Sequence, residues 1–444
     1  CARSECVRWL RRSIVPVPAQ VLYAWHLRPG AFERLAPPWE RVELLERPAR
    51  LSEGARVVLR IGGRRWVAEH RRFVDGRGFE DVQLEGPFAA WRHVHRFVPA
   101  EAETSWLEDE IDYRLPLDAF AAPLVGRRVE RRLRRAFDYR HRVVQGDLER
   151  HRAVADRPRL AVGVSGSSGL VGSALSAFLT SGGHRVVPLV RQGAGFAPEG
   201  FAGVDAVVHL AGESIARRRW SAAQKERIAD SRVQRTRWLA EALARLERPP
   251  RALIAASAIG YYGDRGTAPL DEQAAAGSGF LADVCQAWEQ ASEPAERAGI
   301  RVVRLRIGVV LSGRGGALAR MLPPFRLGLG GRIGDGRQVM SWIALDDLVG
   351  AIHFALYRAE LHGAVNATAP EPVTNAEFAA TLGRVLRRPA VVPLPAVVVR
   401  GLLGEMGQEL LLSGAHVVPG RLEAAGFRFL RPGLESALRH ELGA

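Results

Sequence analysis

Cysteine is scarce in this chain of 444 residues. Its three cysteines, Cys1, Cys6 and Cys285, are too few and too widely spaced for a disulfide framework or for a zinc-binding pattern. We therefore assign no metal ligand. Long apolar runs are also missing, since no stretch approaches the roughly 18 residues of a membrane-spanning helix, and the first residues lack a signal-peptide layout. These absences predict a cytoplasmic protein without a membrane segment.

Lysine is almost absent, because arginine supplies nearly all the positive charge. Lys225 is the only lysine among 63 basic residues, and the formal net charge is +15. Such a charge could indicate a nucleic-acid partner, but the arginines are scattered along the whole chain. In their densest run, residues 127–142, four apolar side chains fall on one helical stripe: Val129, Leu133, Ala136 and Phe137. We interpret the run as the solvated face of an amphipathic helix and expect no nucleic-acid partner.

Residues 1–150 have the pattern of an α+β domain. Period-two alternation predicts strands at residues 56–61, 64–68, 91–97 and 105–113. A short helix is expected at residues 19–26, after Pro18, and the long arginine-rich helix follows the strands. This order is typical of the helix-grip fold, and the region resembles the START-like, polyketide-cyclase-like superfamily. The resemblance implies a curved sheet that wraps the long helix and holds an apolar ligand against it.

Six aromatic side chains are candidates for lining such a pocket: Trp25, Phe32, Trp39, Trp66, Phe88 and Trp91. Aromatic residues at these spacings are more often ordinary core residues. Both interpretations stay open at this point.

The remainder of the chain alternates apolar runs with amphipathic helices. Residues 146–158 are polar and lack clear periodicity, which indicates a linker, and we bound this linker at residues 151–158. Short apolar runs predict buried strands at residues 160–164, 185–190, 206–210, 252–256 and 302–307, with helices at 170–181, 221–246 and 279–298. This alternation predicts an α/β Rossmann domain, a doubly wound parallel sheet, over residues 159–370. Helical patterns then dominate residues 371–444, which predicts a small helical tail.

A glycine-rich motif connects the first of these strands to its helix. Gly166, Gly169 and Gly172 follow the apolar strand directly and open the amphipathic helix. In a dinucleotide-binding fold, one such glycine makes the tight turn, another lets the backbone approach the pyrophosphate, and the third allows helix and strand to pack closely. The helix N-terminus then points its free N–H groups at the phosphates. The motif therefore predicts a dinucleotide site.

The spacing of these glycines resembles that of extended short-chain dehydrogenases/reductases. The resemblance continues through residues 208–212, 255–263, 304–311 and 341–348. It implies cofactor contacts from the glycine motif, the later segments and the helix between them: Gly166, Ser168, Gly169, Leu170, Val171, Gly172, Leu210, Ala211, Gly212, Glu226, Arg232, Ser257 and Val310.

A narrower resemblance rests on four further segments. Arg219-Trp220, Ser231-Arg232, residues 322–331 and residues 374–378 are typical of a subgroup of nucleotide-sugar epimerase-like proteins. That subgroup has a helical C-terminal domain of unknown function, and some of its members carry an N-terminal helix-grip domain. The resemblance then covers essentially the whole chain.

Cofactor choice depends on the end of the second strand. An acidic residue there would bind the ribose 2′-hydroxyl of NAD, whereas a basic residue accommodates the 2′-phosphate of NADP. Arg191 stands at this position and favours NADP(H), with NAD as the alternative. The competing interpretation is that Arg191 is one more exposed arginine in an arginine-rich chain.

The catalytic residues of the superfamily are missing. Its members use a tyrosine acid/base and a lysine four residues later that lowers the pKa of the tyrosine. Lys225 precedes every tyrosine of the Rossmann domain, so no such pair exists. If Glu289 is aligned with the glutamate usual in the family, Leu281 and Cys285 take the two positions. The remaining catalytic candidates are the hydroxyls of Ser257, Tyr261 and Tyr262.

Two functions follow from these observations. The leading hypothesis is an NADP(H)-dependent oxidoreductase or epimerase-like enzyme that acts on an unidentified nucleotide-sugar-like or carbonyl substrate. The alternative is a non-catalytic NADP(H)-sensing protein coupled to a ligand-binding helix-grip domain. Loss of the tyrosine–lysine pair favours the second hypothesis, whereas the substrate-side loop at residues 328–342 favours the first.

Overall fold

The computed structural model describes residues 6–48, 50–116, 122–192, 195–196 and 198–444. Cys1 lies outside these residues. The chain divides into two compact units, which consist mainly of residues 1–158 (unit 1) and residues 159–442 (unit 2). No described helix is long and apolar enough to cross a membrane.

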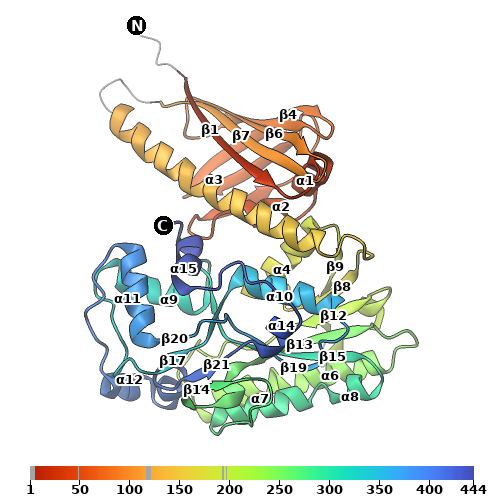
Figure 1. Ribbon diagram of the computed structural model, residues 1–444, viewed down its shortest axis with the longest axis vertical. Coiled ribbons are helices and arrows are strands. Elements are labelled where there is room, and N and C mark those ends of the chain that lie inside the picture. Colours follow the sequence, from red (N-terminus) through yellow and green to blue (C-terminus); the bar gives the residue numbers. More distant parts are fainter. Residues whose placement is uncertain (1–5, 49, 117–121, 193–194, 197) are drawn as a thin grey trace. The chain divides into compact units, whose positions relative to one another are not determined.

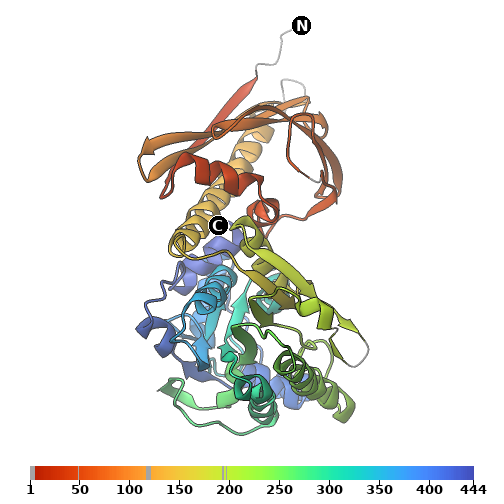
Figure 2. The same ribbon diagram turned by 90° about the vertical axis from the view of Figure 1, so that its right-hand side faces the viewer.

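Unit 1 is a seven-stranded antiparallel sheet with one long helix against its concave face. Figure 2 shows the sheet arching over α1 and α3. The sheet has the order β1-β7-β6-β5-β4-β3-β2. In chain order the elements are β1 (Val7–Val15), α1 (Ala19–Leu27), α2 (Ala31–Leu35), β2 (Val42–Glu46), β3 (Arg56–Ile61), β4 (Arg64–Val74), β5 (Gly78–Glu85), β6 (Ala90–Glu101), β7 (Thr104–Arg114) and α3 (Ala122–Arg152). The predicted helix-grip fold is confirmed.

Helix α3 buries the stripe that the sequence predicts. Leu133, Ala136 and Phe137 are buried against Ile111 and Tyr113 of β7, while the arginines between them lie on the outer side. The helix continues through Arg152, so residues 146–152 are helical rather than part of a linker. Buried side chains such as Leu148 extend the apolar stripe into this segment, although its composition is polar.

Unit 2 is built on a six-stranded parallel sheet with the order β19-β15-β13-β12-β8-β9. Its strands are β8 (Ala161–Ser165), β9 (Arg185–Leu189), β12 (Ala206–His209), β13 (Ala252–Ala258), β15 (Arg301–Ile307) and β19 (Gly363–Ala367). Strand β9 forms one edge and contains Pro188. The next segment forms the short hairpin β10 (Arg191–Gln192) and β11 (Gly195–Phe196) and the turn η1 (Pro198–Phe201) instead of another strand of this sheet.

Helices cover both faces of this sheet, as Figure 1 shows for unit 2. Helices α4 (Leu170–Ser181) and α10 (Leu345–Tyr357) pack on one face, where Phe178 and Ile352 belong to the main core. Helices α6 (Val233–Ala244) and α8 (Glu293–Arg297) pack on the other face through Leu239 and Ala295. This arrangement is the predicted Rossmann architecture.

Two predicted long helices are each interrupted. The helix expected at residues 221–246 divides into α5 (Ala222–Asp230) and α6, and the one expected at 279–298 divides into α7 (Phe280–Gln290) and α8. Pro294 stands in the first turn of α8, where its missing N–H is tolerated because a new helix begins. At the first break the Ser231 hydroxyl accepts a hydrogen bond from the Glu213 N–H.

The C-terminal segment contains helices and short strands and packs in unit 2. The elements after α10 and β19 are β20 (Val373–Thr374), α11 (Asn375–Leu386), α12 (Ala396–Leu403), α13 (Glu405–Gly407), η3 (Gln408–Leu412), β21 (Ala415–Val417), α14 (Gly420–Ala424) and α15 (Leu434–Leu442). Thr374 and Glu377 form a capping box that starts α11. Leu438 of α15 then packs with Phe378 of α11.

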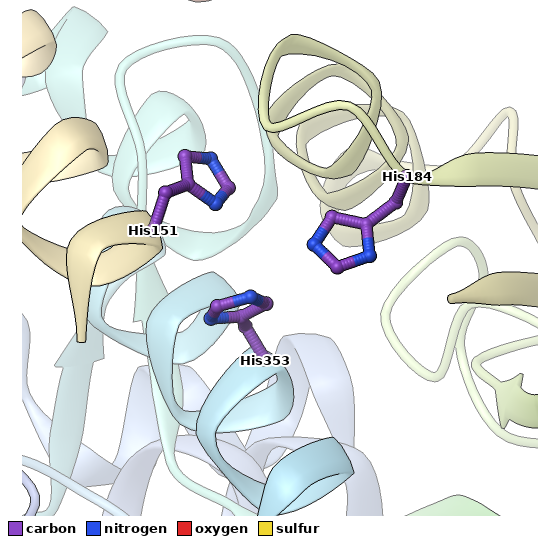
Figure 3. A group of neighbouring side chains, drawn as sticks. All are labelled: His151, His184 and His353. Carbon is purple, nitrogen blue, oxygen red and sulfur yellow. The ribbon is translucent and has the colours of Figure 1, made fainter. Parts of the chain in front are cut away.

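Two histidines pack beside the sheet of unit 2 (Figure 3). The ring of His184, just before β9, lies 5.4 Å from the ring of His353 on α10, measured between centroids, at an interplanar angle of 81°. His184 Nδ1 accepts a hydrogen bond from the Leu160 N–H. This hydrogen bond connects the residue before β8 with the residue before β9.

Candidate functional site

The candidate site lies where the direction of strand succession reverses in unit 2. Strand β8 has β9 on one side and β12 on the other, so the chain after β8 and the chain after β12 leave the sheet at the same edge. In open α/β sheets, ligands bind in the crevice at such a point. The residues between β8 and α4 are the glycine motif, and those after β12 are Leu210, Ala211 and Gly212.

The glycine loop is shaped by backbone contacts. Gly166 has φ +73°, and a Cβ at this residue would lie 2.9 Å from the Ala211 nitrogen. A Cβ on Gly172 would lie 2.1 Å from the Gly166 carbonyl oxygen. Only glycine therefore fits at either position. The Gly169 N–H donates to the Gly166 carbonyl at 3.0 Å, which closes the turn before α4.

Gly169 itself faces open space. The Gly166 carbonyl oxygen, at 3.3 Å, is the one described atom that a Cβ at Gly169 would approach within 4 Å, and both Ser168 and Gly169 are exposed. The backbone N–H groups in the first turn of α4 are therefore accessible, because no side chain at Gly169 covers them. These residues fit the diphosphate of a dinucleotide.

The chain after β12 forms the opposite wall. Gly212 is exposed, and the Cζ atom of Arg232 would lie 3.6 Å from a Cβ built on it. Arg232 donates to the Glu213 carbonyl at 3.0 Å and to the Ile228 carbonyl at 3.1 Å, and burial lowers the pKa of its guanidinium. Arg232 is therefore held at the wall, with its orientation fixed by backbone acceptors.

A neutral pair lies beneath the loop. The Ser165 hydroxyl and Nδ1 of His209 are 2.5 Å apart, and both residues are buried. Burial lowers the pKa of His209 to about 4, so its ring carries no charge at neutral pH. This pair joins the ends of β8 and β12 without placing a charge under the loop.

The other predicted cofactor contacts belong to further elements of unit 2. Val310 lies in β16 (Val309–Leu311), and Leu170 packs near Gly315 and Gly316, which follow that strand. Glu226 is exposed on α5. Arg191 belongs to β10, but its side chain lies outside the described part of the structure.

The catalytic candidate Ser257 lies at the end of β13 and is bound to protein. Its hydroxyl donates to Glu289 Oε1 at 2.7 Å, and the same carboxylate accepts two hydrogen bonds from Arg306, at 2.8 and 2.9 Å. Ser257 and Arg306 are buried. This bidentate pair on adjacent elements fixes the serine hydroxyl in one orientation.

The two tyrosines of the candidate set differ in exposure. Tyr262 is fully buried, and its hydroxyl lies 2.7 Å from Asn366 Oδ1 and accepts from Arg306 at 2.9 Å. Burial raises its pKa, against the opposing effect of Arg306. Tyr261 is half-buried, with the Arg306 guanidinium 3.4 Å from its ring centroid. Sequence reasoning did not single out Arg306 or Asn366. Arg306 belongs to the segment 304–311 that carries the family resemblance, but nothing in that segment points to Glu289 or Tyr262, and Asn366 lies outside the motifs.

Leu281 and Cys285 are the residues that take the positions of the superfamily's catalytic pair if Glu289 is aligned with the family's usual glutamate. Leu281 and Cys285 of α7 both face the chain after β13, 3.2 Å and 3.6 Å from the position of a Cβ on Gly260. Cys285 is buried, which raises its pKa to about 12, so the thiol is not ionised at neutral pH. Neither side chain can transfer a proton at this point.

A cleft of about 410 Å³ lies beside α7 and α8. It is lined by Tyr261, Gln286, Glu289, Gln290, Glu293, Glu296, Arg297 and Arg304. None of these residues belongs to the glycine loop or to the wall after β12. The cleft is therefore distinct from the crevice between the glycine loop and the wall after β12, and the backbone of these two segments shapes that crevice.

Three family models match successive parts of the chain. A polyketide cyclase/dehydrase and lipid transport family matches residues 15–138, the NAD-dependent epimerase/dehydratase family matches residues 162–367, and a domain of unknown function matches residues 394–441.

Relatives with the same epimerase region are found in bacteria and animals. The chain is 47% identical to an epimerase family protein of Mycobacterium bovis over 281 residues, which is 60% of this chain and 93% of the relative. It is 39% identical to the human epimerase family protein SDR39U1 over 287 residues, 62% of this chain and 97% of the human protein.

Solved structures agree with this relationship. A nucleoside-diphosphate sugar epimerase from Corynebacterium glutamicum shares 35% identity with a TM-score of 0.80, covering 98% of this chain and 90% of that one. The structure of human SDR39U1 with NADPH shares 37% identity with a TM-score of 0.60, covering 64% of this chain and 99% of that one. The chain belongs to the NAD-dependent epimerase/dehydratase family.

Proposed function

We propose that this protein binds NADP(H) in the crevice of unit 2 and acts as an epimerase-family oxidoreductase on a nucleotide-sugar-like or carbonyl substrate. The observation that carries the proposal is the glycine loop, where Gly166 and Gly172 admit no side chain and Gly169 leaves the first turn of α4 open. The NADPH bound to the human relative supports the choice of cofactor.

The chain's own residues would bind and orient the cofactor and the substrate, and the Tyr261 hydroxyl would donate the proton that a carbonyl oxygen needs when the carbon accepts a hydride. The first turn of α4 would hold the diphosphate, Arg191 would select the 2′-phosphate, and Arg232 would complete the wall after β12. A bound nicotinamide would supply or accept a hydride. Tyr261 is the most exposed of the three catalytic candidates and would face the substrate, whereas Ser257 and Tyr262 would act through the contacts that fix them.

A second candidate function is NADP(H) sensing without turnover. It is favoured by Leu281 and Cys285, because an apolar residue and an un-ionised thiol occupy the two positions where the superfamily keeps its acid/base pair. Under this hypothesis the nucleotide occupancy of unit 2 would be the signal, and it would alter what the helix-grip domain or a partner binds.

The binding step is tested by calorimetric titration of NADPH and NADH into the wild type and Gly169→Leu. The leucine would occupy the approach to the loop, and its Cβ would lie 3.3 Å from the Gly166 carbonyl oxygen, a tight contact that a small shift relieves. We therefore expect loss of NADPH binding with only a small change in melting temperature. Gly401→Leu is the matched control, because nothing lies within 4 Å of a Cβ at that exposed helical glycine. Equal affinity in all three proteins would contradict the cofactor assignment.

Turnover separates the two candidate functions. A panel of nucleotide-sugar and carbonyl substrates would be assayed with NADPH for the wild type, Tyr261→Phe and Cys285→Ala. An oxidoreductase would turn over at least one substrate, with a lower kcat in Tyr261→Phe and an unchanged rate in Cys285→Ala. Tight NADPH binding with no turnover across the panel would favour sensing.

A further inference from the structure

Unit 1 contains a group of polar side chains inside its apolar core, and we call it the histidine cluster. It consists of His70 on β4, Asp81 on β5, His93 and His95 on β6, Asp109 on β7 and His141 on α3. All are buried except Asp81, whose side chain is 22% exposed and connects the cluster to solvent.

Strand register brings the cluster together. Asp81 lies opposite His70 on one neighbouring strand and opposite His93 on the other. His95 lies opposite Asp109. Since alternate residues of a strand share a face, His93 and His95 point to the same side of the sheet. From α3, the His141 ring reaches Asp109, which places the cluster between the sheet and the helix.

Apolar side chains enclose this polar band. Phe79, Phe97 and Leu107, each two residues from a cluster member, belong to one apolar core, and Ile111 and Phe137 belong to another. A buried carboxylate beside a second, largely buried one is costly unless positive charge lies nearby. Arg140 of α3 interacts with both Asp109 and Asp81, and histidine protons or a cation would supply positive charge between them.

The donor atoms are spaced as metal ligands are. Asp81, His93 and His95 each offer one atom, and these three atoms lie within 4.8 Å of one another. Oδ2 of Asp81 is 3.2 Å from Nε2 of His95 and 3.7 Å from Nδ1 of His93. Ligands bound at about 2.0–2.2 Å from one zinc-sized ion are separated by roughly 3.3 Å. A small movement of His93 would complete the site.

Asp109 lies behind both imidazoles. Its Oδ1 is 2.8 Å from Nε2 of His93 and 3.0 Å from Nδ1 of His95, in each case the ring nitrogen opposite the one that faces Asp81. Its Oδ2 is 2.8 Å from Nε2 of His141, whose Nδ1 is 2.6 Å from the Ser13 hydroxyl. A carboxylate bonded to the far nitrogen of a histidine is the usual way in which metal-ligating histidines are oriented. Asp109 makes such a hydrogen bond with His93, and it lies close to the corresponding nitrogen of His95 without hydrogen-bonding geometry.

Two polar atoms at the centre have incomplete hydrogen bonding. Among the described residues, Oδ1 of Asp81 and Nδ1 of His95 are buried and meet no partner in hydrogen-bonding geometry, although His70 and Asp109 lie within 3.0 Å of them. A cation drawn into the cluster would reorient both groups and satisfy them. Neighbouring His70 would then keep Asp81 in place or serve as a fourth ligand.

We propose that Asp81, His93 and His95 form a binding site for a divalent first-row transition-metal ion in unit 1, with Asp109 as the positioning residue for both histidines. Two imidazoles and one carboxylate are the ligands that such ions take, and three protein ligands leave coordination positions open for water or a ligand. The site is separate from the nucleotide crevice and does not depend on the proposed function of unit 2.

The test uses the full chain, stripped of metal with a chelator and titrated with Co²⁺ and then Zn²⁺. We expect one equivalent of Co²⁺ to give visible d–d absorption, Zn²⁺ to displace it, and Zn²⁺ to raise the melting temperature in a concentration-dependent way. X-ray absorption of the zinc-loaded wild type should show at least two imidazoles and an oxygen ligand. These wild-type measurements require no variant to fold. No stoichiometric binding to the wild type would overturn the proposal.

Variants assign the ion to the cluster. His93→Gln and His95→Gln should lose binding, and Asp109→Asn should weaken it at least about 10-fold. Far-ultraviolet circular dichroism checks that each variant is folded. His353→Gln is the control, because it removes a buried histidine of unit 2 that packs beside His184 (Figure 3). Loss of the cobalt signal in His353→Gln, with binding retained in folded His93→Gln and His95→Gln, would show that the ion binds elsewhere and overturn the assignment.

Discussion

The glycine loop of unit 2 and the histidine cluster of unit 1 are made from different parts of the polypeptide. The loop is a backbone structure within seven consecutive residues, 166–172. Its shape and its accessibility depend on the absence of side chains at its three glycines. The cluster is a side-chain structure that gathers residues from four strands and a helix, from His70 to His141. A contiguous motif tolerates changes elsewhere, whereas the cluster depends on the register of every strand that contributes to it. The two sites therefore fail in different ways when mutated.

The largest effect should come from removing the charge at the centre of the cluster. Asp109→Asn leaves three histidines without their common acceptor, and breaking a buried pair of this kind costs about 3–5 kcal/mol. Urea unfolding of the metal-free protein should show this loss in the transition of unit 1. Asp112→Asn, on the same strand but paired with the exposed Arg8, should cost less than about 1 kcal/mol. Equal losses would show that the cluster adds nothing beyond an ordinary surface pair.

A buried carboxyl in unit 2, that of Glu441, provides the contrast, because its own pKa is raised rather than lowered. Burial raises the pKa of Glu441 to about 7, and the nearby Asp346 carboxylate adds to this effect. The Gly313 N–H, Arg314 and the Ser312 hydroxyl oppose the rise. The folded protein therefore keeps a proton that the unfolded chain releases near pH 4.5.

Since the folded state binds more protons, the stability of unit 2 should fall as pH rises from about 4.5 to 7 and then level off. The total change attributable to Glu441 is about 3 kcal/mol at most. Glu441→Gln should flatten this part of the pH profile in thermal unfolding, while Glu423→Gln, at an exposed position of α14, should leave it unchanged. An unchanged slope in Glu441→Gln would contradict the prediction.

A smaller effect should distinguish residues of unit 2 that stabilise the fold from residues that bind the nucleotide. Tyr262→Phe removes a hydroxyl that Arg306 and Asn366 share, and the unsatisfied buried groups should cost about 1–3 kcal/mol. The affinity for NADPH should stay within about twofold of wild type, because the glycine loop is formed by backbone. Differential scanning calorimetry and NADPH titration measure the two quantities. A large loss of affinity with unchanged stability would place Tyr262 in the nucleotide site.

The sequence predicts the loop well because the determinants are local. A turn and the start of a helix are predicted by three glycines, Gly166, Gly169 and Gly172. The apolar run before them predicts a buried strand. The two helix interruptions, at residues 231–232 and 291–292, are harder to predict because the amphipathic pattern continues across both. The end of α3 was misplaced for a similar reason, since a polar composition hides the buried Leu148.

The histidine cluster could not be predicted in the same way. His93 and His95 alternate along one strand, which indicates a shared face, but nothing near them in the sequence points to Asp81 or Asp109. Their proximity depends on the pairing of β5, β6 and β7, which are linked by hairpins whose register is set by turns and bulges. A contact map of the sheet, rather than any local motif, is needed to find such a site.

The edge strand β9 has a consequence for how this protein behaves in a crowded cell. A parallel sheet that ends in an open strand offers unpaired N–H and C=O groups to the strands of other molecules. Pro188 is the fourth of the five residues of β9 and has no N–H to offer, and the paired strands β10 and β11 follow. The ladder therefore cannot be extended regularly past this residue. The proline near the end of this edge strand therefore also hinders pairing with a strand of another molecule.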